Sequence, residues 1–394
     1  MTSTTFSRWA QALFLSAVAA LAAGCATAPG SSNAELPFDQ AIAAATDGLA
    51  SQTQGFLASI SGKRGVVVDP MIDAGSAQQT VATQMLQERV TDRMTSKADS
   101  LEIMPFQGAS MGKARYLLTG TMTRLAVDKP QGPIRIDLAL TELASGIVVA
   151  QSSAVTRDEG LDHTPLPYYR DTPMAVKDRV IEGYIRTTAT PPGQRADAYY
   201  FERIAVAPAI KDATSAYNAQ RYQDAYAQYS AASGSPVGDQ MRVLNGMYLS
   251  SAKLGRTAQA QDAFGKLVAY GIANQQLGVK FLFNPNSTVF WSETQISGPY
   301  PMWLHEIAKA SADAKVCLDI IGHTSHTGPV AYNDVLSMQR ARYVQQRLVD
   351  ESTSLSERTT PSGRGFRENI IGSGTDDAVD ALDRRVEFKI VNCS

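Results

Sequence analysis

The amino-acid sequence predicts a multidomain α+β protein with three folded parts. In residues 36–200, helix-like patterns alternate with β-branched runs, as in an α/β domain followed by a connecting segment. Residues 201–276 hold two related stretches with small residues at helical spacing. In residues 277–394 the order is strand (279–284), helix (302–313), strand (315–324), helix (332–349), strand (368–374) and strand (384–391), with a loop from residue 350 before the third strand. This order predicts a two-layer βαβαββ sandwich. At 394 residues, the chain is long enough for each part to bury a core.

Residues 1–24 predict a signal peptide, because Arg8 is their only charge and precedes a short apolar run. The run ends in LAAGC, which resembles the lipobox of bacterial lipoproteins, although Ala22 stands where leucine is usual. The resemblance implies cleavage before Cys25 and its modification with lipid, including palmitate. An ordinary secretory cleavage site or an uncleaved anchor is the alternative. Residues 25–35 predict a flexible tether, and Ala26 in place of a retention aspartate implies the outer membrane, facing the periplasm.

Residues 36–200 predict an α/β domain with a connecting segment. The order between residues 65 and 155 resembles the domain shared by the CsgG and LpoB lipoprotein families and the TolB amino-terminal domain. The expected elements are a helix at 38–57, a strand from 65, a helix at 78–94, strands at 116–127, 134–143 and 146–155, and a helix at 174–184.

The stretches in residues 201–276 are related at an offset of 35 residues, with Ala225 beneath Ala260 and Tyr229 beneath Phe264. This spacing resembles tetratricopeptide repeats, in which small residues let helices approach and an aromatic side chain fills the gap. Two unrelated amphipathic hairpins are the alternative. Two repeats do not usually stand alone, so we expect them to pack on a neighbouring domain and to offer a concave surface to a protein partner.

Composition excludes one class of partner and leaves the redox state open. With 36 basic and 38 acidic residues, the chain has no charge footprint for nucleic acid. Two further cysteines, Cys317 and Cys393, fall in expected strands. An oxidising periplasm permits a disulfide between them, but only if those strands are neighbours, which the sequence leaves undecided.

One motif singles out residues 277–394. The stretch GHTSHTGPVAYNDVLSMQRARYVQQRL begins at Gly322, directly after an apolar run. It resembles the core of the OmpA carboxy-terminal, peptidoglycan-binding family, whose usual pattern is Gly-His-Thr-Asp, Gly, Tyr-Asn, Leu-Ser, Arg-Ala and a closing leucine. The later DRRVEF resembles the family's Asn-Arg-Arg-Val, with Asp383 in the asparagine position. The resemblance implies non-covalent binding of peptidoglycan.

The function hypothesis depends on Arg340. On a helix, Leu336, Val344 and Leu348 form an apolar stripe, and Arg340 falls within its range. A guanidinium there needs a partner, which is either an internal carboxylate or that of a ligand. The resemblance makes it the holder of the diaminopimelate carboxylate of a stem peptide. The residues that the resemblance assigns to binding are Thr324, Ser325, Gly328, Asn333, Ser337, Arg340 and Arg384.

Ser325 departs from the family, which usually has an aspartate for the zwitterionic end of the ligand. Losing one charged partner costs about 1–3 kcal/mol. The segment before Asp383 is shorter than in the family, so Asp376, Asp377 or Asp380 could replace the charge. The alternative is a degenerate domain that no longer binds peptidoglycan, in a protein that assembles or scaffolds an envelope complex.

Metal binding and catalysis are weaker interpretations. His323 and His326 are three residues apart, but no third ligand has suitable spacing. Ser325 lies beside His326 without the glycines of a nucleophile elbow. We therefore expect no enzyme activity, no metal and no cofactor.

Overall fold

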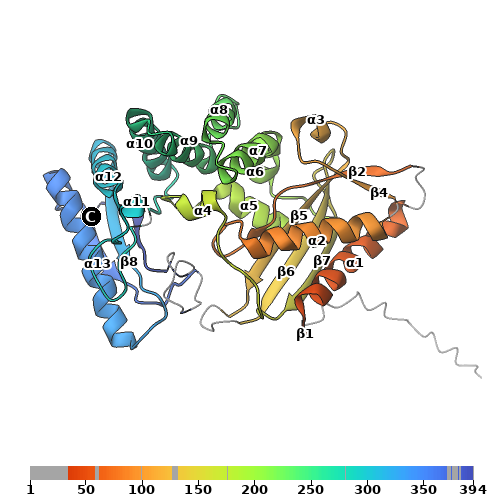
Figure 1. Ribbon diagram of the computed structural model, residues 1–394, viewed down its shortest axis with the longest axis horizontal. Coiled ribbons are helices and arrows are strands. Elements are labelled where there is room, and N and C mark those ends of the chain that lie inside the picture. The colour runs from red at the N-terminus through yellow and green to blue at the C-terminus, as the bar shows by residue number, and fades with distance from the viewer. Residues whose placement is uncertain are drawn as a thin grey trace, which may run out of the picture. The chain divides into compact units, whose positions relative to one another are not determined.

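The computed structural model describes residues 34–57, 62–98, 100–126, 132–174, 176–279, 281–370, 374, 380 and 383–393 (Figure 1). The predicted signal peptide, Cys25 and most of the tether lie outside the described residues, as do Asp376 and Asp377. The chain divides into residues 1–31 and a compact unit of residues 32–394. None of the helices in the described ranges is both long and apolar enough to span a membrane.

A mixed sheet of seven strands forms the amino-terminal part of this unit. Its order is β1-β7-β6-β5-β2-β4, with β3 paired to β5. β2 is parallel to β4 and β5, whereas β5, β6 and β7 are antiparallel, close to the expected ranges. The strands are β1 (Glu35–Leu36), β2 (Arg64–Val68), β3 (Ile72–Asp73), β4 (Leu101–Met104), β5 (Tyr116–Arg124), β6 (Ile134–Glu142) and β7 (Val148–Thr156).

Helices cover both faces of this sheet. Val66 and Val68 of β2 belong to a core with α1 (Phe38–Leu57) and α2 (Val81–Lys97), whereas Val67 belongs to a second core with α5 (Arg179–Thr188). α5 begins five residues later than the start expected at Met174, because the Asp178 carboxylate accepts a hydrogen bond from Ile181 N and caps the helix there. The short helices are α3 (Gly108–Met111), α4 (Pro167–Asp171), α6 (Ala198–Phe201) and the 3-10 helix η1 (Ile204–Val206).

Four helices form two consecutive hairpins where the repeats are expected. They are α7 (Ala207–Asn218), α8 (Tyr222–Ser233), α9 (Met241–Lys253) and α10 (Thr257–Ala273) (Figure 1). The aligned side chains of Ala225, Tyr229, Ala260 and Phe264 are all buried. Tyr229 covers Gly246 of α9 so closely that a Cβ there would lie 2.3 Å from its ring. Small residues and aromatic rings therefore pack together; the assignment to tetratricopeptide repeats stays a prediction.

The hairpins pack on both neighbouring parts of the unit. Phe264 of α10 stacks on Trp303 with ring centroids 5.5 Å apart, and the Trp303 Nε1 donates to the Tyr248 hydroxyl at 2.8 Å. On the other side, the Tyr168 hydroxyl of α4 donates to the Arg242 carbonyl at 2.7 Å. One hydrophobic core therefore extends from the sheet through the hairpins to the carboxy-terminal part.

The carboxy-terminal part packs helices on a three-stranded sheet of order β10-β8-β9. β9 is parallel to β8, and β10 is antiparallel to it. The elements are α11 (Thr294–Ser297), α12 (Tyr300–Asp313), β8 (Cys317–Gly322), α13 (Val330–Glu351), the 3-10 helix η2 (Thr353–Leu355), β9 (Thr359–Gly363) and β10 (Val386–Val391).

Two of the four strands expected here are not found in the described residues. The described residues of the run 279–284 form only isolated bridges, Met174 to Val279 and Phe283 to Phe290. The strand expected at 368–374 is not the third strand, since β9 lies earlier, in a segment expected to be a loop; residues 371–373 lie outside the described residues. Pro361 and Gly363 are unfavourable in strands, so the sequence does not indicate β9. Proline is tolerated at a sheet edge, and β9 is an edge strand.

A disulfide joins Cys317 to Cys393, with their Cα atoms 5.2 Å apart and a sequence separation of 76. The antiparallel register makes it possible, because Val391 of β10 lies opposite Cys317 of β8. The bond therefore ties the end of the chain to the central strand.

Cys393→Ser is expected to lower the free energy of unfolding by about 2–5 kcal/mol, because the closed loop restricts the unfolded chain. Urea unfolding of the variant and of the reduced wild type should give the same loss, and Cys25→Ser should give none. Equal stability of oxidised and reduced wild type would contradict the prediction.

A buried carboxylate links the sheet to the helices behind it. Asp69 follows β2, is 4% exposed, and accepts a hydrogen bond of 2.6 Å from the Tyr200 hydroxyl. Burial raises the pKa of Asp69 to about 6, although the Arg242 charge and the Tyr200 hydrogen bond act in the opposite direction.

Asp69→Asn is expected to raise the free energy of unfolding by about 2–3 kcal/mol at pH 8. The pKa of Asp69 in the folded protein lies above its ordinary value of 3.8. The protonated carboxyl therefore contributes its full stability to the folded wild type below pH 3.8, and this stability is lost as the pH rises through about 6. Urea unfolding at acidic, intermediate and alkaline pH should show the variant's advantage growing with pH. An advantage independent of pH would contradict the assignment.

Candidate functional site

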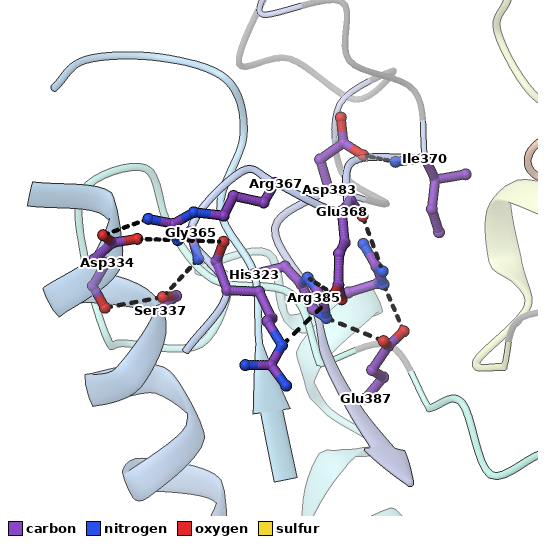
Figure 2. A network of polar contacts seen from close by, with 11 residues as sticks. His323, Asp334, Ser337, Gly365, Arg367, Glu368, Ile370, Asp383, Arg385 and Glu387 are labelled. Carbon is purple, nitrogen blue, oxygen red and sulfur yellow. Dashed lines mark hydrogen bonds and ion pairs between the residues drawn. The ribbon is translucent and has the colours of Figure 1, made fainter. Parts of the chain in front are cut away.

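The predicted binding residues gather at one edge of the carboxy-terminal sheet. β8 and β9 are parallel, so the loops that follow them, 323–329 and 364–370, leave the same edge. α13 begins directly after the first loop and carries Asn333, Ser337 and Arg340 past both. Figure 2 shows the contacts that join these loops to α13 and to the start of β10.

Arg340 connects two segments of backbone, the turn at residues 284–287 and residue 323 directly after β8. Its Nε donates to the Ser287 carbonyl at 3.0 Å, Nη1 to the His323 carbonyl at 3.2 Å, and Nη2 to the Asn284 carbonyl at 3.1 Å. The guanidinium carbon also lies 5.1 Å from the centre of the Phe283 ring, and the side chain is 1% exposed. Sequence reasoning weighed a carboxylate partner and missed these carbonyls, because backbone acceptors have no sequence signature.

Asn333 holds the first loop. Its Nδ2 donates to the Thr327 carbonyl at 2.7 Å and to the Pro329 carbonyl at 3.1 Å. Between them, Gly328 has a backbone φ of +79°, which residues other than glycine rarely adopt. Ser325 Oγ lies 3.3 Å from Thr327 Oγ1 within the same loop. The Asn333 amide and Gly328 therefore shape the turn between β8 and α13.

Ser337 holds the second loop against α13. Its hydroxyl donates to the Asp334 carbonyl at 3.0 Å and accepts from Gly365 N at 2.9 Å (Figure 2). The Gly365 carbonyl in turn accepts from Thr324 N at 2.9 Å. The two loops are thus joined to each other and to the helix.

The DRRV motif brings further charges to this edge. Arg384 is 1% exposed and lies over the Trp291 ring, with its guanidinium carbon 5.3 Å from the ring centre. Asp383 Oδ1 accepts from Ile370 N at 2.6 Å. Asp380, one of the three acids considered as replacements for the missing aspartate, is fully buried.

The two histidines of the motif have different surroundings. The His326 ring packs edge-on against the Phe366 ring, with the ring centroids 4.2 Å apart. His323 is fully buried, and burial lowers its pKa, although nearby Glu387 acts in the opposite direction. Burial acts to raise the pKa of Glu387, but the contact with His323 and the Arg385 charge outweigh that effect and lower the pKa to about 2.

Six of the seven predicted binding residues are buried. Their exposed fractions are 2% for Thr324, 3% for Ser325 and Asn333, 0% for Ser337, and 1% for Arg340 and Arg384, whereas Gly328 is exposed. The hydrogen bonds of Arg340, Asn333 and Ser337 hold the two loops in place. Their assignment to ligand binding stays a prediction.

Residues 282–381 match the model of the OmpA family, so this part of the chain is an OmpA-family domain. Three solved structures are similar to the chain. The peptidoglycan-associated lipoprotein from Burkholderia pseudomallei is 20% identical, covering 28% of this chain and 89% of that one, with a TM-score of 0.25. An outer membrane protein from Borrelia burgdorferi B31 is 26% identical, and the match covers 29% of this chain and 85% of that one, with a TM-score of 0.22. The OmpA-like domain of FopA1 from Francisella tularensis subsp. tularensis SCHU S4 is 17% identical, and the match covers 29% of this chain and 75% of that one, with a TM-score of 0.22. No curated protein matches the chain.

Arg340→Met is expected to lower the free energy of unfolding by about 3–5 kcal/mol, because three carbonyls lose their donor. Arg347→Met, on the exposed side of the same helix, should change it by about 0.5 kcal/mol or less. Urea unfolding of both variants measures the difference. A loss of less than about 1 kcal/mol for Arg340→Met would show that the fold does not need this guanidinium.

Proposed function

We propose that this protein is an outer-membrane lipoprotein that binds peptidoglycan non-covalently and tethers the membrane to the cell wall. The match of residues 282–381 to the OmpA family, with Arg340 in the family's arginine position, carries the proposal. The LAAGC motif supports attachment through lipid on Cys25, on the periplasmic side of the outer membrane. The role is binding without catalysis or cofactor.

The proposed ligand group is the diaminopimelate of the stem peptide. Three carbonyls hold the Arg340 guanidinium in a fixed orientation, and a fixed fork of donors suits a carboxylate. Thr324 and Ser325 add hydroxyl groups from the first loop. Because Arg340 is only 1% exposed, binding requires this loop to move, and the tip of the loop at Gly328 is exposed.

The second candidate is an assembly or scaffold protein of an envelope complex. The burial of Arg340 and of the other five buried binding residues favours it, as does serine at position 325. In this case the OmpA-family domain keeps its loops for structural reasons, and the α7–α10 hairpins bind a protein partner.

Ser325→Asp is expected to strengthen binding to purified cell-wall sacculi by roughly 5- to 150-fold, since it restores the charge that faces the ammonium group of diaminopimelate. Co-sedimentation of the full chain with sacculi measures the affinity. Ser356→Asp adds the same charge at an exposed position and should leave binding unchanged. Thermal melts of both variants show whether they remain folded.

Free diaminopimelate should release the bound protein, whereas lysine, which lacks the second carboxylate, should not. If sacculi retain neither the wild type nor a folded Ser325→Asp variant, the peptidoglycan proposal fails. A stoichiometric protein partner recovered under those conditions would then support the scaffold role.

A further inference from the structure

His323 is a buried imidazole between two carboxylates. Its Nε2 lies 3.1 Å from Glu387 Oε1, and its Nδ1 lies 4.0 Å from Glu368 Oε2. The side chain is fully buried, whereas Glu387 is about a third exposed and Glu368 about half. His323 directly follows β8, Glu368 lies in the loop after β9, and Glu387 lies in β10. Figure 2 shows the three side chains close together.

The contacts of His323 lack hydrogen-bond geometry. Among the residues that the structure describes, neither ring nitrogen has a hydrogen-bond partner, although Glu387 Oε1 is within reach. A fully buried polar nitrogen without such a partner is unusual and needs an explanation. Two ligands of one tetrahedral metal, each bound at about 2.0–2.1 Å, lie roughly 3.3 Å apart and point at the metal instead of at each other. The 3.1 Å distance between His323 Nε2 and Glu387 Oε1 fits that arrangement.

We propose that His323, Glu368 and Glu387 form a binding site for a divalent metal ion of the zinc type. The three ligand atoms would be a single ring nitrogen of His323 and one oxygen from each glutamate, and these atoms lie within 4.8 Å of one another. One imidazole nitrogen and two carboxylate oxygens suit Zn²⁺, whereas Ca²⁺ and Mg²⁺ prefer ligand sets made of oxygen alone. The site complements the proposed function but does not depend on it.

Arginines orient the two carboxylates from outside the cluster. Arg385 Nε donates to Glu387 Oε2 at 2.9 Å, and its Nη2 donates to the Glu368 carbonyl at 3.3 Å. Arg364 Nε lies 3.4 Å from Glu368 Oε1. Each carboxylate thus has one oxygen toward an arginine and the other toward His323, an arrangement of outer partners that is common around metal ligands.

The proposed metal site is next to Arg340. The His323 carbonyl accepts from Arg340 Nη1, so a metal on the ring would fix the strand end that supports this guanidinium. Sequence reasoning paired His323 with His326 and missed the site, because both glutamates lie far along the chain and only folding brings them together.

The test is a titration of the untagged full chain with Zn²⁺ against a fluorescent zinc chelator, without cell-wall material. The wild type should bind one Zn²⁺ at this site. Glu368→Gln, a change at a half-exposed side chain, should raise the Kd at least about tenfold. Glu351→Gln is the matched control, because Glu351 pairs with His305 at 2.9 Å outside the cluster and should leave the Kd unchanged.

Co²⁺ serves as a spectroscopic probe of the same site. Its visible absorption bands should show tetrahedral ligation in the wild type and in Glu351→Gln, and they should weaken in Glu368→Gln and Glu387→Gln. The proposal fails if the wild type does not saturate with Zn²⁺, or if the Kd of Glu368→Gln equals that of Glu351→Gln. Since no peptidoglycan is present, either result leaves the proposed function untouched.

Discussion

The carboxy-terminal domain depends on one guanidinium that donates to three carbonyls in two separate backbone segments. Arg340 donates to the carbonyls of Asn284 and Ser287, before α11, and to that of His323, directly after β8. A charge is costly to bury unless its donors are satisfied, and once they are satisfied the surrounding backbone has few alternative arrangements. The loops at this edge of the sheet are therefore specified by polar contacts more than by packing.

The same contacts decide what the site can do chemically. A guanidinium that already holds three carbonyls is rigid, which favours selective recognition of an anion, but it is also buried, which opposes access. Structural and binding roles of Arg340 are therefore not exclusive. The arginine that contacts the first loop is also the donor that we propose for the ligand carboxylate.

The hairpins α7–α10 do not form a separate core. Their aromatic side chains meet Trp303 on one side and Tyr168 on the other, so burial in one part of the unit depends on its neighbours. Two hairpins expose too much apolar surface to be stable alone, and this shared core removes that surface from water. A surface offered to a protein partner must then come from the faces that this packing leaves exposed.

The sequence by itself determined most helices, the three long strands β5, β6 and β7, and the OmpA-family motif, because these rest on periodicity and local spacing. It placed Asn333, Ser337 and Arg340 on one helix face for the same reason. Only the tertiary structure decided that β9 lies at Thr359–Gly363, that Cys317 meets Cys393, and that His323 faces Glu368 and Glu387. Those features join residues distant in the chain, and strand neighbours and carbonyl partners leave no local pattern to read.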